Sequence, residues 1–133
     1  MTFEVSTGRR FACVDVTDQV ARWLRGREDG LCHVFVPHAT AGLALIEMGS
    51  GTEQDVETAL ADLLPRKEER WVHRHGSPGH GADHVLPVIV SSSLVIPVFG
   101  GRMALGTWQS IALIDPNTNN PTRTVRVSFL AGT

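Results

Sequence analysis

The chain has 133 residues, of which 12 are basic and 14 acidic, giving a net charge of −2 with histidine neutral. A chain of this length forms one hydrophobic core, so we expect a single domain over residues 1–133. Like charges are not clustered and no apolar stretch has the length of a membrane helix, which argues against a protein that binds nucleic acid or membranes.

The two cysteines and the amino terminus bear on the cellular compartment. Cys13 and Cys32 are far apart in strand-like stretches and fit no metal or redox spacing, so we expect buried, reduced thiols. The opening M-T-F-E-V-S-T has neither the basic start nor the hydrophobic segment of a secretion signal. A cytoplasmic location is the simplest expectation.

The first expected elements are a strand and a helix. β-forming residues fill positions 11–16, which predicts a strand. Thr17 and Asp18 follow as a capping pair for a helix with Val20, Trp23 and Leu24 on one face, and Gly26 is expected to end it.

Two strands and a second helix are expected next. Apolar runs at 31–36 and 43–48 predict the strands. Thr52 is expected to cap a helix that ends before Pro65. The apolar stripe of this helix would consist of Val56, Leu60, Leu63 and Leu64.

Three more strands are expected at 94–99, 110–114 and 124–130. The last of these alternates apolar and polar residues, as a half-solvated antiparallel strand does. The segment D-P-N-T-N-N-P between positions 114 and 123 predicts a turn. Many strands and two helices favour an α+β domain in which the sheet curls into a sandwich or barrel with the helices packed outside.

The loop W-V-H-R-H-G-S-P-G-H-G-A-D-H, residues 71–84, is crowded with histidine. Histidine is the commonest metal ligand and acts as an acid or base near neutral pH, so the cluster points to chemistry. Another histidine, His38, ends an apolar run as an isolated polar residue. The loop histidines are His73, His75, His80 and His84.

Three blocks of sequence carry a resemblance. They are H-A-T-A-G-L-A-L-I-E at 38–47, the histidine loop, and S-S-S-L-V-I-P-V-F-G-G-R-M-A-L-G-T-W-Q-S-I at 91–111. Together they resemble the YjbQ family, also called UPF0047, and L-G-T-W-Q is the most specific part. The resemblance covers residues from about 3 to 130.

The resemblance implies a compact α+β domain with a mixed, partly closed sheet, assembled as a homotrimer. It also implies a secondary thiamine-phosphate synthase, which couples a pyrimidine pyrophosphate to a thiazole phosphate and releases pyrophosphate. It further implies a divalent metal ion, zinc, held among the histidines.

Carried over residue by residue, the resemblance selects His38, His73 and His84 as metal ligands. Glu47 matches a carboxylate of the family, while Trp108 and Gln109 belong to its L-G-T-W-Q block. The chain departs from the pattern in two places. The family usually has Asn beside the glutamate, and the loop has two extra histidines, which are expected to be solvated.

The chemistry of these residue types agrees in outline. Three neutral imidazoles with an open fourth position form a catalytic zinc site. Glu47 could act as a general base or orient an imidazole, and His38 and Arg102 complete the expected catalytic residues. Phosphate contacts are expected from Arg102 and from the serines Ser91, Ser92 and Ser93, and the Trp108 ring could form a pocket wall beside Gln109.

Several other interpretations remain open at this stage. The loop histidines and Arg102 could face solvent, and Trp108 could belong to the core. The same residues would also suit a metal-dependent phosphoester or pyrophosphate hydrolase. A third possibility is a non-enzymatic trimer that binds a metal or a phosphorylated metabolite.

Overall fold

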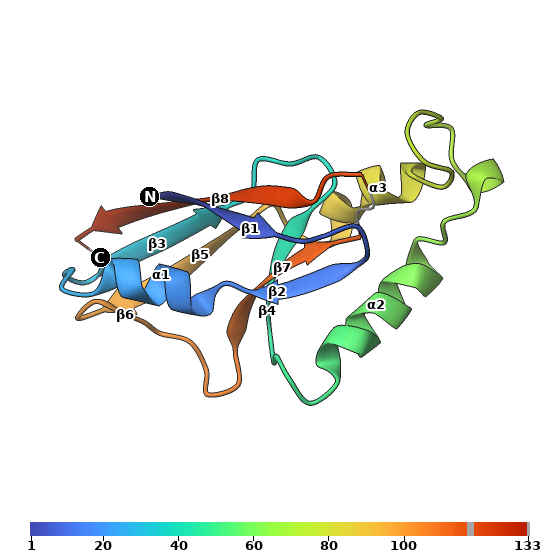
Figure 1. Cartoon of the computed structure of the whole chain (residues 1–133). Helices are drawn as coiled ribbons and strands as arrows, with labels where there is room; N and C mark the ends of the chain where they lie inside the picture. The colour runs from blue at the N-terminus through green and yellow to red at the C-terminus, as the bar shows by residue number, and fades with distance from the viewer. Residues whose placement is uncertain (117–118, 133) are drawn as a thin grey trace.

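Eight strands and four helical segments follow one another along residues 1–116 and 119–132, which the computed structural model describes (Figure 1). The strands are β1 (Thr2–Ser6), β2 (Ala12–Asp15), β3 (Gly30–Phe35), β4 (Gly42–Ile46), β5 (Ser93–Phe99), β6 (Arg102–Met103), β7 (Ser110–Asp115) and β8 (Thr122–Ala131). The helices are α1 (Thr17–Leu24), α2 (Thr52–Leu63) and α3 (Gly81–Ile89), with a short 3-10 turn, η1, at Glu68–Arg70.

The strands form two curled sheets. The larger has the order β1-β8-β3-β5-β6 and the smaller the order β2-β7-β4. The predicted α+β class with a partly closed sheet is confirmed. In detail, the family resemblance implied a mixed sheet, whereas every strand pairing in the described part of the chain is antiparallel. Short connections such as the one between β5 and β6 allow only antiparallel neighbours.

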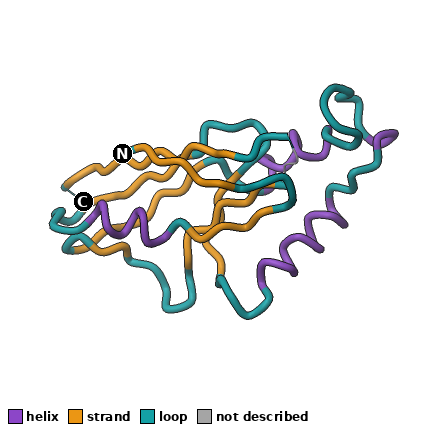
Figure 2. The backbone as a smooth tube through the Cα atoms, in the orientation of Figure 1, coloured by secondary structure: helices purple, strands orange, loops and turns teal. Residues whose placement is uncertain are grey.

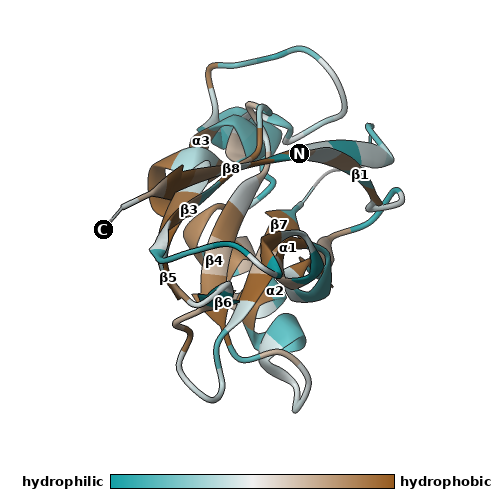
Figure 3. Ribbon diagram, turned by 90° about the vertical axis from the view of Figure 1, so that its left-hand side faces the viewer, coloured by the Kyte–Doolittle hydropathy of each residue, from teal (hydrophilic) through white to brown (hydrophobic). Residues whose placement is uncertain are grey.

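The hydrophobic core lies between the two sheets. Alternate residues of the strands point inward, such as Val34 and Val127 in the larger sheet and Leu43 in the smaller, and all three are almost fully buried. Apolar colour accordingly follows the strands in Figure 3. The predicted alternation of the last strand is confirmed, because Val125 and Val127 are buried while Arg126 and Ser128 are exposed.

Helix α1 packs on this core through Val20 and Leu24, as predicted. The expected cap is wrong. The Thr17 hydroxyl accepts a hydrogen bond from the Ile111 N–H at 2.8 Å, and the Asp15 carboxylate accepts one from the Thr17 N–H at 2.9 Å. The side chain of Thr17 therefore ties the helix to β7 instead of capping it.

Helix α2 extends beside the sheets and buries none of its own residues (Figures 1 and 2). Its bounds agree with the prediction, but Thr52 makes no side-chain cap and Leu63 of the predicted apolar stripe is 58% exposed. Only its carboxyl-terminal end, through Leu60 and the following Leu64, contacts a small second core formed with α3.

Other elements were not predicted from the sequence, namely β1, β6, η1 and the whole of α3. Part of the predicted turn near position 117 lies outside the described residues. Both cysteines are free, and Cys32 is buried while Cys13 is half-buried. No helix of the described chain is long and apolar enough to cross a membrane.

Candidate functional site

The histidine loop is held against the amino-terminal end of α3 by specific contacts. The Trp71 indole N–H donates to the Pro65 carbonyl at 2.8 Å, and the Glu68 carboxylate accepts a hydrogen bond from the Gly79 N–H at 2.5 Å. Gly81 lies so close to Trp71 that a β-carbon on Gly81 would approach the Trp71 Cβ to 2.5 Å. These contacts fix the path of residues 71–80 and bring their histidines next to α3.

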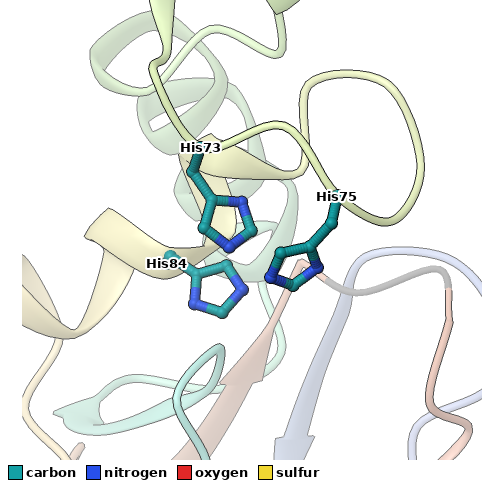
Figure 4. Close-up of side chains that lie close together, drawn as sticks. All are labelled: His73, His75 and His84. Atoms are coloured by element: carbon teal, nitrogen blue, oxygen red, sulfur yellow. The ribbon is translucent and has the colours of Figure 1, made fainter.

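Three imidazoles converge at this point. His73 and His75 come from the loop and His84 from α3, and their rings face one another (Figure 4). One ring nitrogen from each lies within 4.8 Å of the other two, which is the one such group of potential metal ligands found across the described residues. The ring centroid of His73 is 3.9 Å from that of His75 and 4.2 Å from that of His84.

The donor set fits a metal ion. The Nδ1 atom of His73 is buried and has no hydrogen-bond partner in the described structure. A buried polar atom without a partner costs about 1–3 kcal/mol, so such an atom in a histidine cluster is typical of a ligand-binding position. Burial, followed by the neighbouring imidazoles of His73, His80 and His75, lowers the pKa of His84. The neutral imidazole, the form that binds metals, is thereby favoured.

His38 lies apart from this group. Its Nε2 atom accepts a hydrogen bond from the Thr124 N–H at 2.8 Å, so its remaining nitrogen, Nδ1, carries the proton of the neutral ring. Burial, and then the positive charge of Arg123, lowers the pKa of His38. The predicted ligand set of His38, His73 and His84 is therefore not assembled as one group within a single chain.

A buried ion pair between Arg123 and Asp115 lies near His38. Arg123 donates to both carboxylate oxygens of Asp115, at 2.7 and 3.0 Å, and to the Thr40 hydroxyl at 2.8 Å. Arg123 is 2% exposed and Asp115 is fully buried. The pair fixes the backbone of β8 next to Thr124, which is the partner of His38.

The three predicted serines lie beside the strand that precedes His38. The Val36 N–H donates to the Ser92 carbonyl at 2.9 Å, and the Leu43 N–H donates to the Ser91 carbonyl at 2.7 Å. The Ser91 hydroxyl is engaged with the backbone of Ser93. His38 and the serines thus share the end of the molecule where α3 joins β5.

The other predicted site residues lie elsewhere in the chain. Ile46 pairs with Ser110, which places Glu47 and Gln109 together at the opposite end of the smaller sheet. The Gln109 side chain accepts a hydrogen bond from the Gly106 N–H at 2.8 Å, and Trp108 is 74% exposed. Arg102 pairs with Phe99, and the strand from Ser93 to that point is about 20 Å long.

Sequence reasoning missed three residues of these arrangements. His75 was expected to be solvated but belongs to the imidazole group. Asp83 and Arg123 are buried charged residues that were not singled out. The sequence H-G-A-D-H did carry a signal, because a carboxylate three residues after His80 can reach it across one helical turn.

A comparison with protein families agrees with the resemblance. The family model described as UPF0047 protein YjbQ-like matches residues 1–132. The chain belongs to the YjbQ family. A relative in Mycobacterium tuberculosis, UPF0047 protein Rv2556c, is 54% identical over 129 residues, covering 97% of this chain and 96% of the relative.

Solved structures share the fold along the whole chain. The hypothetical protein APE1520 of Aeropyrum pernix is similar with a TM-score of 0.89 and 35% identity, covering 99% of this chain and 98% of that one. The YbjQ-like protein SSO2532 of Sulfolobus solfataricus has a TM-score of 0.86 and 28% identity, covering 99% and 96%.

Proposed function

We propose that this YjbQ protein is a metal-dependent enzyme that acts on a phosphorylated small molecule. A divalent ion, zinc, would be held by His73, His75 and His84. The observation that carries this proposal is the convergence of three imidazole nitrogens within 4.8 Å, beside a buried nitrogen of His73 that lacks a partner. Three neutral imidazoles are a known ligand set for a zinc ion with an open position.

Such an ion would neutralise negative charge on a phosphate oxygen. The chain itself contributes orientation. His38 is fixed by Thr124 with its Nδ1–H available as a donor, and a neutral donor of this kind can bind a phosphate oxygen. The serines that follow α3 lie on the same side of the fold, and the hydroxyls of Ser92 and Ser93 would offer further donors.

The proposed assembly is a homotrimer. Glu47, Arg102, Trp108 and Gln109 lie away from the imidazoles within one chain, so a complete site requires that another copy supplies them. The outer face of the larger sheet supports an assembly of copies, because it exposes apolar side chains of β5 and β8, the strands on either side of β3, and exposed apolar patches often mark an interface. These side chains are Val95, Phe99 and Leu130, each at least 58% exposed.

The proposed reaction is the one implied by the family resemblance. A pyrimidine pyrophosphate reacts with a thiazole phosphate, a carbon–nitrogen bond forms, and pyrophosphate leaves. Arg102 and the serines would contact the departing phosphates, and Trp108 would stack on a planar ring. Two alternatives would use the same residues. The first is a hydrolase that cleaves a phosphoester or pyrophosphate. The second is a trimer that binds a metal or metabolite and has no turnover.

Elemental analysis of protein purified without an affinity tag tests the proposed metal. We expect about one zinc per chain, lost in His73→Ala and His84→Ala and retained in His33→Ala. His33 is the matched control, because it is exposed on β3 and is not in the imidazole group. Metal-free wild-type protein, or variants that keep their zinc, would overturn the site.

Measurement of product formation then distinguishes the three candidate functions, namely synthase, hydrolase and binding protein. The zinc-loaded protein is incubated with a pyrimidine pyrophosphate alone and together with a thiazole phosphate. Coupled product supports the synthase, and release of phosphate without the second substrate supports a hydrolase. Bound zinc with no turnover of either kind contradicts an enzyme and leaves the binding trimer.

A further inference from the structure

His80 is a fourth imidazole beside the proposed metal site, and its surroundings differ from those of a solvated loop residue. Its side chain is only 11% exposed, and its ring centroid is 4.8 Å from that of His84. The centroid distances from His80 to His73 and His75 are 5.8 and 6.1 Å. His80 therefore adjoins the imidazole group through His84, while the ring nitrogens that all lie within 4.8 Å of one another are those of His73, His75 and His84.

The buried carboxylate of Asp83 holds the ring of His80 in place through its Nδ1 atom. The Nδ1 atom of His80 is 3.1 Å from one oxygen of Asp83, and the other oxygen of Asp83 is paired with Arg66. Asp83 is 2% exposed. Because a carboxylate paired with arginine acts as an acceptor, His80 Nδ1 carries a hydrogen, and the lone pair of the neutral ring lies on Nε2.

That lone pair faces His84, one member of the imidazole group. His80 Nε2 lies 3.1 Å from His84 Nε2. Two nitrogens bound to one tetrahedral zinc at roughly 2.0–2.1 Å are about 3.3 Å apart, so the observed spacing is close to that of a ligand pair. His80 immediately precedes α3 with helical backbone angles, and His84 is one turn later, the spacing at which two histidines on one helix share a metal.

The geometry points to His80 as a fourth metal ligand, with Asp83 and Arg66 as the residues that position it. This inference rests on the proposed function, since it adds a ligand to the ion held by His73, His75 and His84. A carboxylate that accepts the second N–H of a ligating histidine fixes the ring and makes it a stronger ligand. Arg66 in turn compensates the charge of Asp83, which would otherwise be buried alone.

A fourth imidazole changes what the centre can do. Three ligands leave one tetrahedral position open, whereas four fill it. With His80 as a ligand, the four histidines would themselves fill the positions of a tetrahedral ion, and a phosphate oxygen would need a further position.

Zinc and cobalt binding by the full chain tests this inference. His80→Asn is the main variant, because Asn is favoured at a helix start and preserves the fold. His84→Asn is the variant expected to lose the ion, and His33→Asn is the matched control. Zinc affinity is measured by competition with a coloured chelator, and the ligand number is monitored by the visible spectrum of the cobalt-loaded protein.

We expect His80→Asn to bind zinc at least about 10-fold more weakly and to change the cobalt spectrum. Asp83→Asn should weaken binding by about 10- to 100-fold and leave the spectrum four-coordinate. Circular dichroism of each metal-free variant shows that it is folded.

If His80→Asn matches the wild type in both measurements while His84→Asn loses the ion, His80 is not a ligand and the proposed three-histidine centre stands. If the wild type binds neither ion, the proposed function and this inference are both refuted.

Discussion

The substitution Arg123→Met tests how strongly the buried ion pair supports the fold next to His38. Methionine replaces the aliphatic part of the arginine side chain but has no charge and no donors, so it removes all three hydrogen bonds of the guanidinium. Two of these go to Asp115 and one to Thr40. Both members of the ion pair are at most 2% exposed, so water cannot replace the lost contacts without a change in structure.

The expected loss of unfolding free energy is about 3–5 kcal/mol, the usual cost of removing one partner from a buried pair. That is a large share of the roughly 5–15 kcal/mol that stabilises a typical domain. Most of this cost comes from leaving the Asp115 charge without its guanidinium. The double variant Arg123→Met/Asp115→Leu should therefore recover much of the loss.

Urea denaturation followed by tryptophan fluorescence measures these differences. Arg126→Met is the control, because Arg126 lies on the same strand with its side chain exposed, and its effect should stay within about 0.5 kcal/mol. The reasoning is refuted if Arg123→Met costs less than about 1 kcal/mol, or if the double variant is no more stable than the single one.

Three further predictions concern the site and its surroundings. Gly81→Ala should cost about 1–3 kcal/mol and weaken zinc binding, because the new methyl group overlaps Trp71, whereas Gly106→Ala meets only a flexible side chain and should be neutral in thermal unfolding. The folded protein holds the pKa of His38 below 6.5, so the unfolded chain takes up a proton first as the pH falls. The stability that the neutral His38 contributes is therefore fully present above pH 6.5 and is lost as the pH falls through the folded pKa. His38→Asn should reduce the difference between urea denaturation curves measured at pH 7.5 and pH 5.5. Trp108→Ala should retain zinc and lose coupled product, and loss of zinc by elemental analysis would contradict the separation of its loop from the imidazoles.

The sequence predicted those elements whose own residues follow a regular pattern of apolar and polar positions. The strand that became β8 alternates clearly, and its buried face follows that alternation. Helix α3 was missed because Pro87 lies inside it and glycines precede it, which are signals of a loop. An apolar stripe was predicted for α2, but Leu63 of that stripe is 58% exposed in the structure.

The site could be predicted in part for a similar reason. Clustering in the sequence identified the histidines, but which rings meet depends on the path of the loop. That path is set by the contacts of Trp71 and Gly79, which no periodicity encodes. His38 was grouped with the loop histidines from the resemblance, whereas within one chain it is bonded to Thr124.

The two cysteines have a consequence for metal selection. Burial raises the pKa of both thiols to about 11, so both stay protonated near neutral pH. Neither thiol belongs to the group of potential metal ligands found among the described residues, so the proposed centre offers nitrogen donors alone. Such donors bind Cu²⁺ more tightly than Zn²⁺ and also accept Ni²⁺. The ion that would fill the proposed centre in a cell therefore depends on the supply of free metal as much as on the protein.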